Sequence, residues 1–191
     1  MSLALLTTRE DHRIAWLAAL AITLHIVEST LPSPIPGVKP GLANIITILT
    51  LIQFGWSTAA WVNLLRVLVG SVLVGSFLSP TFILSLAGAI SSIMVLRVAS
   101  WLPLSGRKQG TGTIGSGGSG FGPIGYSVLA AMAHMAGQFY TAYLLFIPHD
   151  ALFHLLPVLM TAAVIFGIIS GFIAHLILGR SLNQPRQSPV R

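Results

Sequence analysis

The sequence predicts an all-helical integral membrane protein with six transmembrane helices. Hydrophobic residues make up 54% of the 191 residues, charged residues make up only 7%, and the mean hydropathy is +0.86. Long apolar runs recur along the chain, and most of the charges lie at the ends of these runs. A soluble domain of this size does not need so apolar a composition for its core, so the composition favours a membrane protein.

Six apolar runs can be read, and most of them reach the roughly 20 residues that a helix needs to cross a bilayer. They cover residues 14–31, 41–54, 57–76, 82–102, 123–147 and 155–178. The second run has only about 14 residues, so a re-entrant segment is an alternative for it. We expect a span, because Pro40 and Gly41 close its outer end and a tight turn at Gly55 joins it to the next run as in a helical hairpin.

We expect residues 14–178 to form one six-helix membrane domain. Residues 1–13 and 179–191 are predicted to be cytoplasmic terminal segments, and residues 103–122 a Gly-rich cytoplasmic loop. The glycines at 110, 112 and 115 match a dinucleotide-binding pattern, but that motif functions between a strand and a helix, and no strand is predicted here. No cofactor is therefore expected.

The orientation of the chain follows from its ten Lys and Arg residues. Six spans place both termini on one side, and that side receives eight of the ten cations, whereas the other side receives only Lys39. Because cytoplasmic loops of membrane proteins are rich in Lys and Arg, we expect a multi-pass inner membrane protein with both termini in the cytoplasm. Four tryptophans fall near the same interface, as in an aromatic belt: Trp16, Trp56, Trp61 and Trp101.

Several classes of function are not supported by the sequence. The pI of about 10.9 is typical of nucleic-acid binding, but the cations lie at the ends of apolar runs, so no nucleic-acid partner is expected. There is no cysteine, and His149 and His154 do not have metal-ligand spacing, so no metal site is expected. No catalytic residue is predicted either, because no two of the four carboxylates form a pair for acid–base work: Glu10, Asp11, Glu28 and Asp150.

Residues 32–44 are the most informative stretch for function. They place four prolines, Lys39 and Asn44 between two apolar runs, and irregular backbone at membrane depth is tolerated mainly where protein buries it or a cavity adjoins it. Glu28 lies near the end of the first run and Arg66 midway along the third. We expect these four polar residues to face a cavity that binds a solute, and a structural ion pair between Arg66 and Glu28 is the alternative.

The fifth run carries His134, Gln138 and Thr141 on one helical face. This face is either the wall of the same cavity or a set of hydrogen bonds between helices. Small residues four apart also recur, including Gly167 and Gly171, and they permit close helix packing. Ala15 and Ala19 on the first run form a similar face, which either packs within the bundle or docks a second membrane protein.

Four sets of segments carry a family resemblance: residues 31–44, 65–71, 77–82 with 85–88, and 122–125 with 133–138. The first set reads Leu-Pro-Ser-Pro-Ile-Pro-Gly-Val-Lys-Pro-Gly-Leu-Ala-Asn, an unusual order of Pro, Gly, Lys and Asn. These segments resemble the bacterial Gx transporter family, which is also labelled heptaprenyl diphosphate synthase component I. The resemblance covers residues 14–178, and the Gly-rich insert near residues 110–120 departs from it.

That family is similar to the S components of energy-coupling-factor importers. The resemblance implies a six-helix bundle that binds a vitamin-like solute or a cofactor precursor and takes energy from a shared membrane subunit and ATPases. The alternative is a non-catalytic membrane accessory subunit of a polyprenyl diphosphate or quinone pathway enzyme. A prenyl synthase itself needs Asp-rich motifs to hold magnesium, and this chain has two aspartates, both outside the predicted spans.

Overall fold

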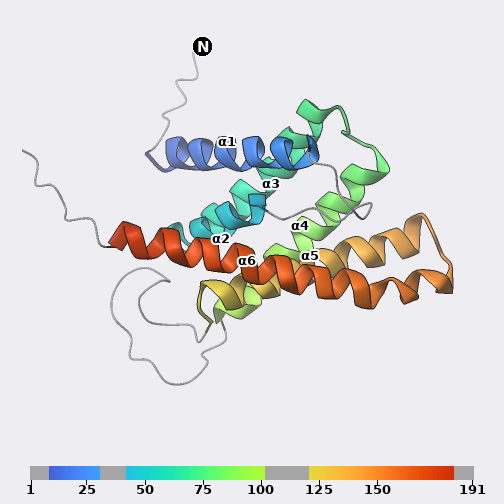
Figure 1. The fold of residues 1–191 in the computed structure, drawn as a ribbon. Helices are drawn as coiled ribbons and strands as arrows, with labels where there is room; N and C mark the ends of the chain where they lie inside the picture. Colours follow the sequence, from blue (N-terminus) through green and yellow to red (C-terminus); the bar gives the residue numbers. More distant parts are fainter. Residues whose placement is uncertain (1–8, 31–41, 102–120, 183–191) are drawn as a thin grey trace, which may run out of the picture.

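The structure is a computed structural model that describes residues 9–30, 42–101 and 121–182 (Figure 1). Each of the six predicted apolar runs coincides with a helix, and the described residues contain no strand. The elements are α1 (Arg9–Thr30), α2 (Leu42–Phe54), α3 (Trp56–Val74), α4 (Pro80–Trp101), α5 (Pro123–Leu145), the short 3-10 helix η1 (Asp150–His154) and α6 (Leu156–Leu182). Most of the predicted Gly-rich loop and of the two terminal segments lies outside the described residues.

Three segments of the described chain have the length and apolar composition of membrane spans. They are Trp56–Val74, Pro80–Trp101 and Asp150–Gly179. Helix α2 has 13 residues, which corresponds to about 20 Å of helix against the roughly 30 Å of a bilayer core. The all-helical class is therefore confirmed, and the number of six spans stays a prediction.

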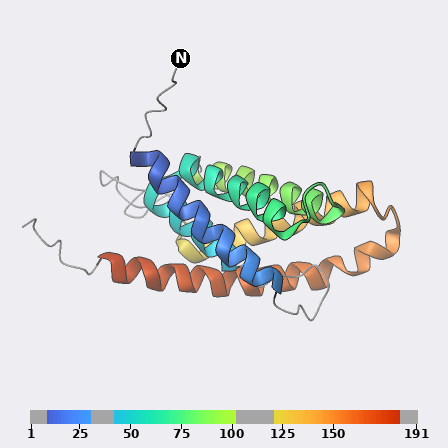
Figure 2. The same ribbon diagram turned by 90° about the horizontal axis from the view of Figure 1, so that it is seen from above.

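Successive helices alternate in direction along the bundle. The starts of α1, α3 and α5 therefore gather with the ends of α2, α4 and α6 at one end of the molecule, on the left in Figure 1. The turn between α3 and α4 and the connection through η1 lie at the opposite end. Figure 2 shows that α1 crosses the other helices obliquely.

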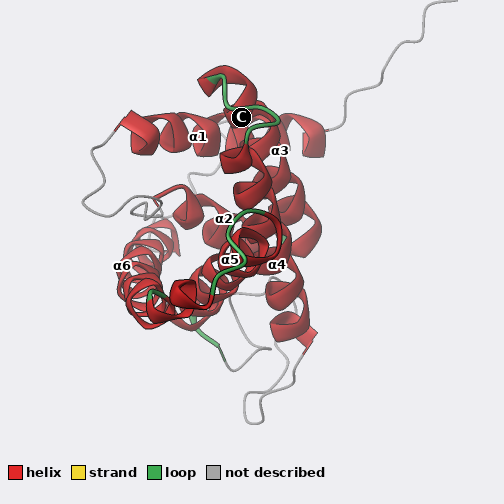
Figure 3. Cartoon of the chain, turned by 90° about the vertical axis from the view of Figure 1, so that its right-hand side faces the viewer, coloured by secondary structure: helices red, strands yellow, loops and turns green. Residues whose placement is uncertain are grey.

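Helix α2 lies in the centre of the bundle. In the end view of Figure 3 it is surrounded by the other helices, and α1, α3, α5 and α6 all contact it. Its residues from Ile45 to Ile48 and from Thr50 to Ile52 are buried. A helix that is apolar on all sides is stable when protein covers it completely, so this short run forms the core.

Two glycines with positive φ shape the connections of α3. Gly55, with φ of 89°, joins α2 to α3 and confirms the predicted tight hairpin turn. Gly75, with φ of 76°, ends α3 as a left-handed cap whose backbone N–H bonds to carbonyls of the last turn. A Cβ at Gly75 would meet nothing within 4 Å, so this glycine serves the turn and not helix contact.

Close packing holds α4, α5 and α6 together. A Cβ on Gly137 of α5 would lie 2.8 Å from the Ser91 Cβ of α4. On α6, a Cβ on Gly171 would lie 2.6 Å from the Ile124 Cα, and one on Gly167 would lie 2.9 Å from the Val128 Cα, both on α5. The predicted role of the Gly167 and Gly171 pair in helix packing is confirmed.

The substitution Gly171→Ala is expected to destabilise the protein by about 1 to 3 kcal/mol, because the added methyl group meets backbone that cannot rotate away. Gly179→Ala is the matched control on the same helix, since a Cβ there meets nothing within 4 Å. The control should keep or raise the stability, because alanine favours a helix over glycine. The measurement is the thermal unfolding midpoint of each purified variant in detergent, and equal midpoints would contradict the packing described here.

Candidate functional site

The side chain of Arg66 lies in the interior of the bundle, midway along the apolar helix α3. Its exposed fraction is 6%. An arginine at the centre of a membrane helix costs about 2.5 to 3.5 kcal/mol on insertion scales, so polar groups have to surround it. The neighbours of Arg66 therefore indicate where the interior of the protein is polar.

One such neighbour is His134 on α5. Its imidazole lies within electrostatic range of Arg66 and of His25 on α1, where a positive charge on His134 would be repelled. His134 Nε2 and Gln138 Nε2 are also hydrogen-bonded at 3.1 Å. The prediction that His134 and Gln138 share one face of their helix is confirmed.

Gly88 on α4 makes room for this histidine and glutamine. A Cβ at Gly88 would lie 2.9 Å from both His134 Nε2 and Gln138 Cγ. His134 also forms a hydrogen bond with the backbone of Gly88. The imidazole is thus held between two helices at a place where α4 presents no side chain.

Asn63 extends the polar region by one turn along α3, although the sequence analysis did not single it out. Its side chain is 2% exposed, and its Nδ2 donates to the Ala89 carbonyl oxygen of α4 at 3.4 Å. The signal was present in the sequence, because Asn63 precedes Arg66 by three residues and so shares its face of the helix. We refer to His25, Asn63, Arg66, His134 and Gln138 as the polar cluster.

The structure describes the other predicted binding residues to different extents. Asn44 is half-buried on α2. It lies eleven residues before Gly55, and Arg66 lies eleven residues after it. Because α2 and α3 form a hairpin at Gly55, these two residues lie at a similar height in the bundle. Thr141 is half-buried one turn beyond Gln138. The Glu28 side chain and Lys39 lie outside the described residues, so a shared cavity for all of these groups stays a prediction.

Buried polar atoms without a hydrogen-bond partner among the described residues include Thr47 Oγ1, Asn63 Oδ1 and Ser127 Oγ. Thr47 precedes Gly55 by eight residues and Asn63 follows it by eight, so the hairpin brings these two to the same level. A buried polar atom without a partner lowers stability.

The polar cluster has the chemistry of a receptor for an anion or a carbonyl group. It combines the permanent charge of Arg66 with amide and imidazole groups. Glu10, Asp11 and Asp150 lie in the first turns of α1 and η1, at helix ends and away from the middle of α3. The described residues contain no group of three or more His, Asp or Glu that could hold a metal ion.

The model of one protein family matches residues 17–177, and this family is described as heptaprenyl diphosphate synthase component I. The match includes every residue of the polar cluster. It confirms the family resemblance that the sequence motifs indicated. The chain has no match among curated proteins and none among solved structures.

The substitution Thr47→Val is expected to keep or raise the stability, by up to about 1 kcal/mol, because a methyl group of similar shape replaces a buried hydroxyl group that has no partner. Thr50→Val is the matched control on the same helix, since the Thr50 hydroxyl is equally buried but donates to the Ile46 carbonyl oxygen at 2.7 Å. This control should lose about 0.5 to 1.5 kcal/mol with its hydrogen bond. Chemical denaturation of both variants in detergent provides the comparison, and a larger loss for Thr47→Val would show that its hydroxyl has a native partner.

Proposed function

The chain belongs to the heptaprenyl diphosphate synthase component I family, and from this premise we propose that it is a membrane transport component that binds a small organic solute. The observation that carries the proposal is the buried Arg66, which lies within electrostatic range of His134, itself hydrogen-bonded to Gln138. An intramembrane cation among other polar side chains is typical of a substrate or ion site. The resemblance of the sequence motifs to the Gx transporter family supports the same function.

The solute would carry a carboxylate, a phosphate or an electron-rich carbonyl group. Arg66 offers a rigid fork of N–H donors that matches such groups. Asn44, near the start of α2, adds an amide at a similar height, and the first amides of that helix carry partial positive charge. Lys39 precedes the helix in sequence and would add a second cation. A vitamin-like compound or a cofactor precursor fits this description.

The chain would lie in the inner membrane as a multi-pass protein with both termini in the cytoplasm. Its energy would come from partners, an energy-coupling membrane subunit with ATPases. Helix α1 offers a face for such a subunit, because Ala15 and Ala19 are exposed whereas Ala18 and Ala21 are buried against the bundle. Small exposed residues four apart allow a second membrane helix to approach closely.

A second candidate function is a non-catalytic membrane subunit of a polyprenyl diphosphate or quinone pathway enzyme. The description of the family as a synthase component favours it. The two functions lead to different results when the protein is purified in mild detergent. A transport component should retain a small solute in defined stoichiometry, which mass spectrometry of the denatured sample detects, whereas an accessory subunit should copurify with a synthase.

Lys39→Ala, Asn44→Ala and Gln138→Ala are each expected to weaken solute retention by about 1 to 3 kcal/mol, or about 5- to 150-fold, because a buried polar group of the solute loses its partner. The measurement is the amount of small molecule that mass spectrometry recovers per protein chain. Gln53→Ala is the control, since Gln53 lies in the last turn of α2, far from Asn44. Equal retention in all four variants would remove these residues from the binding site.

Cysteine-labelling experiments test the proposed topology, and the absence of native cysteine gives them no background. Single cysteines at both termini and at Gly115 should react only from the cytoplasmic side, because the Lys and Arg distribution places these points there. Cysteines at Lys39 and Asp150 should react only from outside. Labelling of Gly115 and Lys39 from the same side would contradict the six-helix topology.

A further inference from the structure

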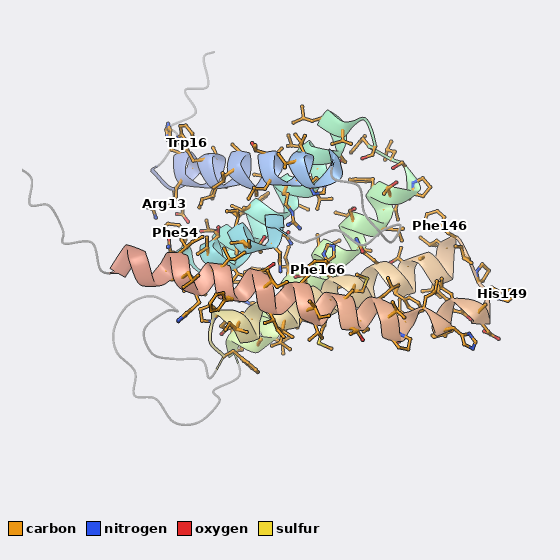
Figure 4. The ribbon with its side chains drawn as sticks, in the orientation of Figure 1. Arg13, Trp16, Phe54, Phe146, His149 and Phe166 are labelled. Atoms are coloured by element: carbon orange, nitrogen blue, oxygen red, sulfur yellow. The ribbon has the colours of Figure 1, made fainter. Side chains whose placement is uncertain are left out.

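A histidine side chain caps the short helix η1 in the connection between α5 and α6. His149 precedes η1, and its Nδ1 accepts a hydrogen bond from the Ala151 backbone N–H at 3.1 Å. The backbone of His149 is extended, with φ of −133° and ψ of 130°, as is usual for the residue that caps a helix. Figure 4 labels His149 at the end of the bundle opposite to Arg13.

This cap is possible only while Nδ1 of His149 carries no proton. A neutral imidazole has one nitrogen that donates and one that accepts, whereas both nitrogens of a charged imidazole are donors. A proton on Nδ1 would therefore replace the hydrogen bond with a repulsion between two N–H groups. His149 is exposed, so protons from solvent reach it. Histidine is also the side-chain type whose charge changes between pH 5 and 8.

The helix η1 holds an aromatic side chain against α5. The centre of the Phe153 ring lies 5.4 Å from that of Phe139 and 5.0 Å from that of Tyr143, with the rings edge to face. Phe139 is 3% exposed and Phe153 is 39% exposed, so Phe153 is the outer member of the pair. Phe139 also follows Gln138 of the polar cluster directly in sequence. The position of η1 therefore affects how well this part of α5 is covered.

The backbone bonds of η1 are few, so one capping bond is a large part of its stability. The helix has five residues. Its backbone bonds include those from the Leu152 N–H to the His149 carbonyl oxygen at 2.9 Å and from the Leu155 N–H to the Leu152 carbonyl oxygen at 3.0 Å. Bonds of a 3-10 helix have poorer geometry than those of an α-helix, and short exposed elements open locally at a low free energy.

The other ionisable groups around η1 predict a different sign of pH dependence or none. Those described are Asp150 and His154 in η1 and Tyr140 and Tyr143 on α5. The described turn between α3 and α4 and the first turns of α6 carry no ionisable side chain. His154 lies in the last turn of η1, where a positive charge is favourable. Its protonation would stabilise η1, so opening at low pH is the effect expected of His149.

We propose that His149 is a pH-sensitive latch on the connection between α5 and α6. With the imidazole neutral, Nδ1 holds the Ala151 amide, η1 stays closed and Phe153 covers Phe139. When Nδ1 takes a proton from solvent, the amide loses its acceptor, η1 opens and Phe153 moves away from α5. The latch depends on contacts at the end of the bundle and not on a bound solute, so it holds for either function considered above.

Hydrogen exchange of the purified full-length protein in detergent tests the latch, with labelling times scaled to the chemical exchange rate at each pH. The protection of the amides of residues 151–155 should fall about fivefold between about pH 8 and about pH 5, since a helix cap contributes about this factor. The amides of α3 in the same sample are the internal control and should keep their protection. Equal protection of residues 151–155 at both pH values would overturn the proposal.

Single variants assign the effect to the imidazole of His149. His149→Asn keeps an acceptor at every pH, so its protection should stay high in acid, whereas His149→Ala should have low protection throughout. His154→Asn and Asp150→Asn keep the cap and should retain the pH dependence of the wild type. A pH dependence that persists in His149→Asn, or one that disappears in His154→Asn or Asp150→Asn, would show that another group titrates.

Hydroxyl-radical footprinting of the wild type follows the movement of Phe153. Phe139 should be oxidised more at about pH 5 than at about pH 8, because the ring that covers it has moved. The exposed Phe77 provides the reference for radical dose in each sample. This readout needs no substitution, so it remains if His149→Ala does not fold. Unchanged oxidation of Phe139 relative to Phe77 would contradict the opening of η1.

Discussion

The burial of Arg66 is the constraint on which the rest of the interior depends. A permanent charge in the middle of an apolar helix is stable only where polar groups from other helices surround it. Polar groups of this interior include Asn63, one turn before Arg66, and His134 of α5, which lies within electrostatic range of Arg66. Because arginine does not lose its proton at any ordinary pH, the interior keeps this positive charge throughout.

Small residues make this polar interior geometrically possible. Gly88 lets the imidazole of His134 lie against α4, and Gly70 of α3 accommodates the ring of His25, whose Cδ2 would lie 3.0 Å from an added Cβ. Gly137 of α5 likewise lets Ser91 of α4 lie close, and Gly171 of α6 lets the backbone of α5 approach at Ile124. In an apolar environment helices associate through close van der Waals contact, so the glycine positions determine where the backbones meet.

The sequence predicted the existence, order and approximate limits of the six helices because length and apolar composition are local properties. It also identified Arg66 and the shared face of His134 and Gln138. It did not predict that α2 is the buried centre of the bundle, because a short apolar run has the same composition in a core as in a lipid bilayer. Contacts between distant residues, such as Arg13 with Phe54, depend on how the helices are arranged and leave no periodic signal.

Helix α3 runs from Trp56, which stacks with Arg97 at one end of the bundle, to Arg66 in the polar cluster and beyond. Arg66 lies ten residues after Trp56 along this helix, about 15 Å away. The Trp56 Nε1 group also donates to the Ile93 carbonyl oxygen of α4 at 3.2 Å, and Asn63 donates to α4 between these two points. Because α3 is bonded to α4 at successive levels, a shift of either helix at the membrane surface would also move the groups around Arg66. The end of the bundle and its polar interior are therefore mechanically connected through one pair of helices.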